Sequence, residues 1–282
     1  MPNIKNSVTN PQKHHWAEYL TEACGLAGFI VGAGLLTTLL EHPHSPVHRA
    51  MSDLPTLLRR VPLGLCMGAY IAGISYSPWG QRSGSHINPS VTWTFFSLGK
   101  IKLRDALFYT LAQFAGAIFA AQLMKAMLGE WYAHPSVNYT ATVPGREVIG
   151  TELAFVAEAL ISFGLMFVML IAINSERLEK LAGLFVGLLV GVYLVVESPF
   201  SGMSMNPART FGSALTAGQW SDWWVYFTAP PLAMLLAGKV YRRLRRGQME
   251  GCAKLYHSQD KPCIFCDHKE SPQYPVKETA AQ

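Results

Sequence analysis

Apolar residues gather in separated blocks along the chain, with polar and charged residues between them. The blocks cover residues 16–40, 61–79, 103–128, 151–174, 181–199 and 223–241. Each block is about 19 to 26 residues long, which matches the length that an α-helix needs to cross a bilayer. The pattern predicts an all-α membrane protein with six transmembrane helices, a polar N-terminal tail over 1–15 and a polar C-terminal tail over 244–282.

Composition supports this prediction, because half of the residues are hydrophobic and only 15% are charged, against about 25% in soluble proteins. The net charge of +5 is not concentrated in one patch, so nucleic acid is not an expected partner. Most basic residues flank the blocks on one side, which predicts that both termini are cytoplasmic. The cytoplasmic set is Lys5, Lys13, Lys100, Lys102, Arg104, Arg177, Lys180, Arg242, Arg243, Arg245 and Arg246, against Arg49, Arg59, Arg60 and Arg146 on the other side.

Two stretches of the chain, 83–92 and 201–210, share one pattern. Each has Ser-Gly followed by Asn-Pro, at Asn88-Pro89 and Asn206-Pro207, with a threonine further on. Asparagine is a good helix N-cap and proline fits the first helical position. The apolar runs that follow end near Leu98 and Leu215. Both are too short to cross a bilayer, which requires a helix of about 20 residues. We therefore predict two re-entrant half-helices.

The two halves of the chain repeat one plan. Glu22 lies in the first block and Glu158 in the fourth, and each half then leads into its Asn-Pro stretch. With three spans in each half, repeat 1 (about 16–128) and repeat 2 (about 151–243) enter the membrane from opposite sides. The half-helix N-termini would then meet near the midplane, where both helix dipoles are positive. Glu22 and Glu158 would accept hydrogen bonds from N–H groups of the two loops.

Other polar residues have more than one interpretation. Arg209, in the first turn of the second half-helix, either pairs with a carboxylate or lines a pore constriction. In the C-terminal tail, Cys263-x-x-Cys266 with two of Cys252, His257 and His268 could hold zinc in a tetrahedral site. Reduced thiols in a flexible tail are the alternative, and the sequence leaves the metal question open.

Together these residues make the chain similar to the aquaporin or major intrinsic protein family over about 16–243. The resemblance implies six spans plus two half-helices, a pore in each subunit, a homotetramer and a passive channel without cofactor or enzymatic activity. It assigns the pore motifs to Asn88-Pro89-Ser90 and Asn206-Pro207-Ala208. The first motif departs from the family's usual Asn-Pro-Ala at Ser90.

The resemblance also implies a selectivity filter of four residues. Ungapped counting from the two asparagines places the filter at Gly68, Leu194, Met203 and Arg209. If the count is shifted, Tyr70 or Tyr193 would project into the filter instead. Gly68 and Leu194 favour a wide, less polar ring, whereas Thr210 stands where glycerol-type members carry aspartate. The expected substrates are therefore water and small uncharged solutes, such as glycerol-like polyols, urea or neutral metalloid acids. The expected location is the plasma or inner membrane.

One rival function is a proton-coupled secondary transporter. Such proteins also use inverted repeats, broken helices and carboxylates within the membrane. In that case Glu22 and Glu158 would carry protons instead of holding loops.

Overall fold

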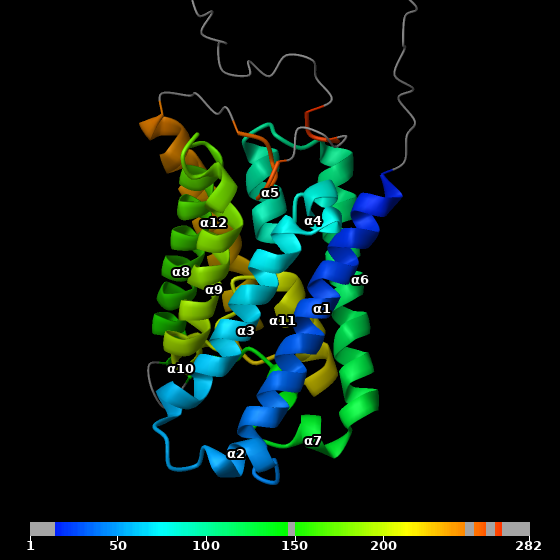
Figure 1. Ribbon diagram of the computed structural model, residues 1–282, viewed down its shortest axis with the longest axis vertical. Coiled ribbons are helices and arrows are strands. Elements are labelled where there is room, and N and C mark those ends of the chain that lie inside the picture. The colour runs from blue at the N-terminus through cyan, green and yellow to red at the C-terminus, as the bar shows by residue number, and fades with distance from the viewer. Residues whose placement is uncertain (1–14, 146–149, 246–250, 258–262, 267–282) are drawn as a thin grey trace, which may run out of the picture.

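The computed structural model describes residues 15–145, 150–245, 251–257 and 263–266, and every regular element within them is helical (Figure 1). Five helical segments are long and apolar enough to cross a membrane. They are α1 (Trp16–Glu41), α3 (Thr56–Tyr76), α6 (Leu103–Leu128), α8 (Gly150–Ile173) and Glu179–Val196, which joins a short turn to α9 (Ala182–Val196). A sixth long helix, α12 (Trp223–Leu244), contains two prolines. The predicted all-α fold is confirmed.

The half-helices are α5 (Pro89–Ser97) and α11 (Pro207–Ala217). Figure 1 shows α5 in the upper half of the bundle and α11 in the lower half. A short helix precedes each of them, α4 (Pro78–Ser83) before α5 and α10 (Ser198–Ser201) before α11. The loops that join α4 to α5 and α10 to α11 therefore run inside the bundle.

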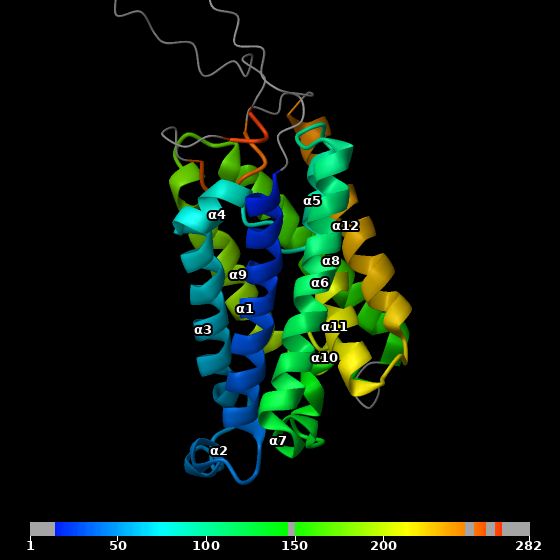
Figure 2. The ribbon, with the colours of Figure 1, turned by 90° about the vertical axis from the view of Figure 1, so that its right-hand side faces the viewer.

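The packing of the helices repeats between the two halves of the chain. Helix α1 packs on α6 as α8 packs on α12, while α5 packs on α12 and α11 packs on α6. Helices α3 and α9 pack on each other, and Figure 2 shows α3 and α1 running side by side along the bundle. This exchange of partners is what an inverted repeat produces.

Glycines allow α3 and α9 to approach closely. A Cβ atom on Gly68 would lie 2.6 Å from the carbonyl oxygen of Gly187, and one on Gly64 would lie 2.5 Å from that of Gly191. Close approach through small residues is typical of helix pairs in membranes. These contacts fix which face of α3 turns toward α9.

Large apolar side chains lie on the outside of the bundle. Leu65 on α3, Leu111 on α6 and Leu188 on α9 are each more than 60% exposed. Such a surface is costly in water and stable against lipid tails. The exterior therefore agrees with a chain embedded in a bilayer.

Candidate functional site

The side chains of Asn88 and Asn206 cap the two half-helices. The Asn88 Oδ1 atom accepts a hydrogen bond from the Ser90 amide at 2.8 Å. The Asn206 Oδ1 atom accepts from the amides of Ala208 at 3.0 Å and Arg209 at 3.2 Å. Pro89 and Pro207 follow at the first helical position, where a missing N–H costs nothing.

The same two amide groups join the half-helices head to head. Asn88 Nδ2 donates to the Met205 carbonyl at 2.7 Å, and Asn206 Nδ2 donates to the Ile87 carbonyl at 2.8 Å. A carboxamide carries two N–H donors, so each asparagine keeps a second one beyond this bond. The N-termini of α5 and α11, and the positive ends of their dipoles, thus lie together.

The loops before the half-helices share an unusual backbone. Gly84 (φ 93°) and Gly202 (φ 79°) end α4 and α10 in the left-handed region, which glycine adopts without steric cost. This requirement explains the Ser-Gly pair that the two stretches share. Four further loop residues also have positive φ: Ser85, Ile87, Met203 and Met205. Residues other than glycine adopt this region only where the surroundings hold them.

Glu22 holds the first loop. Its carboxylate is fully buried and accepts from the amides of His86 at 3.1 Å and Ile87 at 2.5 Å. The Gln113 side chain on α6 donates to the same carboxylate at 2.8 Å. These bonds satisfy a buried acceptor group that would otherwise be costly.

Glu158 holds the second loop in the same way. Its buried carboxylate accepts from the Ser201 hydroxyl at 2.6 Å and from the amides of Ser204 at 2.6 Å and Met205 at 2.8 Å. Both carboxylates therefore bind N–H groups of the left-handed loop segments.

Two tyrosines that sequence reasoning missed also support the loops. The Tyr109 hydroxyl on α6 donates to the Ser83 carbonyl at 2.7 Å, and the Tyr226 hydroxyl on α12 donates to the Ser201 carbonyl at 2.6 Å. A signal was present, because a tyrosine within an apolar span needs a partner for its hydroxyl. Their equivalent places in the two repeats extend the symmetry of the site.

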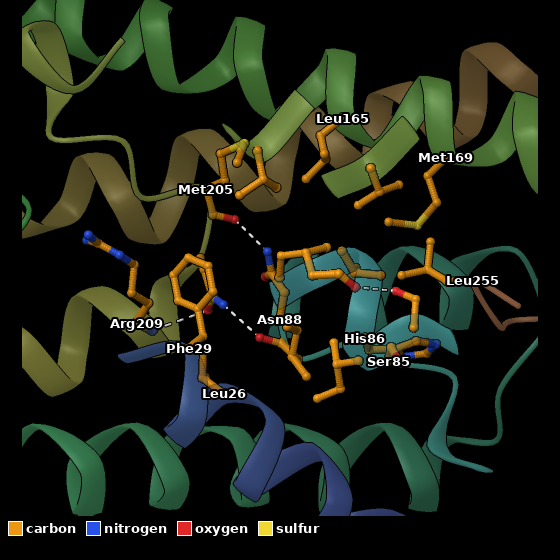
Figure 3. A pocket seen from close by; sticks show the side chains of 18 of the residues that line it. Leu26, Phe29, Ser85, His86, Asn88, Leu165, Met169, Met205, Arg209 and Leu255 are labelled. Atoms are coloured by element: carbon orange, nitrogen blue, oxygen red, sulfur yellow. Dashed lines mark hydrogen bonds between the residues drawn. The ribbon is translucent and has the colours of Figure 1, made fainter. Parts of the chain in front are cut away.

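A cavity lies at the meeting point of the two half-helices. Its volume is about 60 Å³ for the centres of water-sized molecules, and one water needs roughly 10–15 Å³ by this measure. It therefore accommodates a short row of waters. Figure 3 shows Arg209 and Phe29 at one end of it, Leu255 and His86 at the other, and Asn88 between them. We call these the Arg209 end and the tail end.

Arg209 lies on the cavity wall and not in an ion pair. Among the described residues no carboxylate is within salt-bridge distance of its guanidinium, and its Nη1 atom is buried without a hydrogen-bond partner. Of the two interpretations of this residue, the structure favours the lining position. A cation fixed here adds to the positive potential of the two helix ends.

The wall of this cavity includes two of the four filter positions obtained by counting. Met203 and Arg209 line the cavity, whereas Gly68 and Leu194 are absent from its described lining. Gly68 faces Gly187 on α9. It precedes the wall residue Ile71 by three positions, and Leu194 follows the wall residue Val190 by four, so each lies about one helical turn from the wall on the same side of its helix. The wall residues are instead Ile71 and Ile74 of α3 with Val186 and Val190 of α9.

The alternative filter residues, Tyr70 and Tyr193, contact neighbouring helices. The Tyr70 hydroxyl donates to the Gly25 carbonyl on α1 at 2.7 Å. The Tyr193 hydroxyl would lie 2.8 Å from a Cβ atom on Gly164 of α8. Both rings fill spaces between helices.

Part of the C-terminal tail contacts the first loop. The Ala253 carbonyl lies 2.9 Å from His86 Nε2, and the Leu255 amide donates to the Gly84 carbonyl at 3.2 Å. The Phe265 ring stacks on His86 with 5.6 Å between centroids. Leu255 thereby becomes part of the cavity wall at the tail end.

The potential metal ligands of the tail also come together. The ligand atoms of Cys252, His257, Cys263 and Cys266 all lie within 4.8 Å of one another. Hydrogen bonding with Cys263 and Cys266 raises the pKa of His257 to about 9, and hydrogen bonds from Cys252 and Cys266 lower the pKa of Cys263. His268, the other ligand considered, lies outside the described residues.

Comparison with known proteins agrees with this geometry. The profile of the family described as Major intrinsic protein matches residues 12–241. Aquaporin NIP3-1 of Zea mays is 35% identical over 181 residues, which are 64% of this chain and 58% of that protein, so the chain spans less than two thirds of it. Aquaporin TIP2-1 of Arabidopsis thaliana is 33% identical over 204 residues, 71% of this chain and 77% of that protein.

A solved structure shares the fold. The X-ray structure of the aquaglyceroporin from Plasmodium falciparum superposes with a TM-score of 0.66 at 19% identity. The superposition covers 82% of this chain and 97% of that one. The fold and the sequence comparisons thus point to the same group of proteins.

Proposed function

The chain belongs to the major intrinsic protein family, and from this premise we propose that it is a passive transmembrane channel for water and small uncharged solutes. The observation that carries the proposal is the cavity in which both asparagine-capped helix ends and Arg209 meet. In aquaporin-type pores generally, selectivity depends on pore diameter, lining donors and the positive ends of half-helices. Lining donors and the positive ends of two half-helices both occur in this cavity.

The donors and charges of the cavity favour neutral solutes. Each asparagine offers a second N–H to a passing oxygen, while the helix dipoles and Arg209 repel cations and protons. The rest of the wall is mostly apolar, including Phe29, Leu165 and Val190. A wall of this kind offers a hydrated ion few groups to replace its water shell.

The rival function, proton-coupled transport, receives less support. Glu22 and Glu158 are both fully buried and both bind backbone N–H groups of the loops. A proton carrier must exchange protons with water on each side in turn. The carboxylates as placed act as structural acceptors, and no enzymatic role is proposed for the cavity.

The assembly that we propose is a homotetramer, spanning the plasma or inner membrane several times with both termini cytoplasmic. The exposed apolar faces of α3, α6 and α9 supply surface for lipid and for other copies. Native mass spectrometry from detergent tests the tetramer. Labelling of cysteines introduced into each tail, from one side of sealed vesicles, tests the orientation.

Stopped-flow light scattering of proteoliposomes tests the channel itself. Water permeability above that of empty liposomes is expected, as is uptake of at least one small uncharged solute. Two matched variants on α9 test whether the measured permeability arises from the cavity. Val190→Trp fills the cavity wall and should reduce permeability to background, whereas Val192→Trp, on the exposed side of the same helix, should leave it unchanged. Equal permeability of the two variants would contradict the proposal.

A further inference from the structure

The four ligand atoms of the tail have the spacing of one tetrahedral metal site. Cys252 Sγ lies 3.5 Å from Cys263 Sγ and 3.2 Å from Cys266 Sγ, and Cys266 Sγ lies 3.4 Å from His257 Nε2. Around a zinc ion with Zn–S bonds of about 2.3 Å, tetrahedral angles place two sulfurs roughly 3.8 Å apart. These separations are too long for disulfide bonds of about 2.05 Å. Three thiols and one imidazole form a donor set that suits zinc.

This cluster is a feature of the tail and not of the channel domain. The family match ends at residue 241, and all four ligands follow it. The described pieces of the tail, 251–257 and 263–266, contain no helix or strand. Short segments of this kind bury too little apolar surface to fold alone, and a structural metal supplies the missing stability.

The segments that the four ligands join are those that touch the pore. Ala253 lies next to Cys252, and its carbonyl lies 2.9 Å from His86 Nε2. Phe265 lies next to Cys266 and stacks on the same histidine. Lys254 donates from Nζ to the Gln81 carbonyl at 2.6 Å. The cluster thus fixes the residues that place Leu255 on the cavity.

We propose that Cys252, His257, Cys263 and Cys266 bind one zinc ion, and that the zinc-bound tail holds Leu255 over the cavity and partly closes the tail end of the channel. Loss of the ion frees the tail and opens this end. The binding of zinc stands independently of the channel function, while the closing of the pore rests on the function proposed above.

Metal analysis of the purified, reduced full-length protein tests the zinc site. One zinc ion per chain is expected, and Cys263→Ser and Cys252→Ser should lose it. Cys66→Ser is the matched control, because Cys66 is an exposed residue of α3 far along the chain from the tail, and it should retain the ion. Cobalt(II) added to metal-free protein should give the visible absorption of tetrahedral thiolate coordination. Absence of zinc, or a Cys252–Cys266 disulfide in its place, would overturn the site.

Permeability measurements test the closing of the pore. Proteoliposomes of the zinc-loaded protein are compared before and after treatment with a membrane-permeant zinc chelator, and a several-fold rise in water permeability is expected. Leu255→Ala should raise the zinc-loaded permeability without loss of zinc, because it removes only the side chain on the cavity. If water permeability rises neither after chelation nor in Leu255→Ala, the proposal that the tail closes the pore is overturned.

The two proposals fail in distinguishable ways. A protein that binds zinc but stays at the permeability of empty liposomes, with chelator and in Leu255→Ala, contradicts the channel and the closing while the zinc site stands. A protein that conducts water and holds no zinc contradicts only the inference of this subsection.

Discussion

Asn88 and Asn206 each hold the loop that leads to the other. Each side-chain oxygen caps its own helix, and each amide nitrogen donates to the carbonyl that precedes the opposite asparagine, at 2.7 and 2.8 Å. The position of either half-helix therefore depends on both. The centre of the channel forms only when the two repeats come together.

Asn206→Ala should destabilise the protein, because it removes the cap of α11 and the bond to Ile87. Loss of a cap costs about 0.5–2 kcal/mol, and an unpaired buried carbonyl costs about 1–3 kcal/mol more. Thermal unfolding in detergent, followed by size-exclusion chromatography, measures the effect. Asn138→Ala is the control, since its side chain bonds with Gln219 at the surface. Equal unfolding temperatures for the two variants would argue against the shared support.

Glu158→Gln should lower the yield of folded protein without creating any proton-dependent phenotype. Glutamine presents an NH₂ group to the donors of Ser204 and Met205, so buried N–H groups lose an acceptor at a cost of about 1–3 kcal/mol. Glu22→Gln should act alike, and Glu152→Gln, at an exposed position in α8, should not. Solute flux at several pH gradients is the second measurement. Flux that follows the proton gradient in the wild type and loses this dependence in both variants would favour the transporter.

Arg209→Ala should weaken the exclusion of cations while water still passes. A unit charge about 4 Å from a passing cation opposes it by roughly 4 kcal/mol at an effective dielectric of 20. Conductance of planar bilayers in alkali chloride solution should therefore rise above that of the wild type. Arg243→Ala, exposed in the last turn of α12, serves as the control. Unchanged cation exclusion in Arg209→Ala would remove this residue from the proposed barrier.

Gly68→Ala distinguishes a packing residue from a filter residue. Its Cβ atom would lie 2.6 Å from the Gly187 carbonyl, and overpacking of this kind costs about 1–3 kcal/mol. Gly73→Ala, on the same helix with nothing within 4 Å of its Cβ, should stabilise by about 0.5–1 kcal/mol. Unfolding temperatures of the two variants provide the test. A stable Gly68→Ala variant with altered solute selectivity would support the filter position instead of the packing role.

Local chemistry explains what could be predicted from the sequence. The asparagine caps follow from short-range rules, because asparagine is a good N-cap, proline fits the first helical position, and the pattern occurs twice with the same flanking residues. Lone carboxylates within a span require donors, and the structure gives Glu22 and Glu158 such donors in the two loops. The helices were predictable in the same way, since their apolar lengths are set by the bilayer.

The apolar residues that line the cavity could not be predicted by counting from the two asparagines. The side chain that faces the cavity from α3 depends on glycine contacts with α9, and a short helix, α4, intervenes before Asn88. The contact of Leu255 with the first loop could not be predicted from the sequence either, because it joins residues that are far apart in the chain. The spacing of the tail cysteines indicated a metal site, but not its contact with the pore.

The tail also breaks the symmetry that the duplication created. The two repeats match where the half-helices meet, yet in the described part of the tail Ala253 and Phe265 contact the first loop and Leu255 lies at one end of the cavity. The permeability of such a channel would therefore be controlled from one side of the membrane. Under our proposals, the metal and thiol balance of one compartment sets how fast both compartments exchange water.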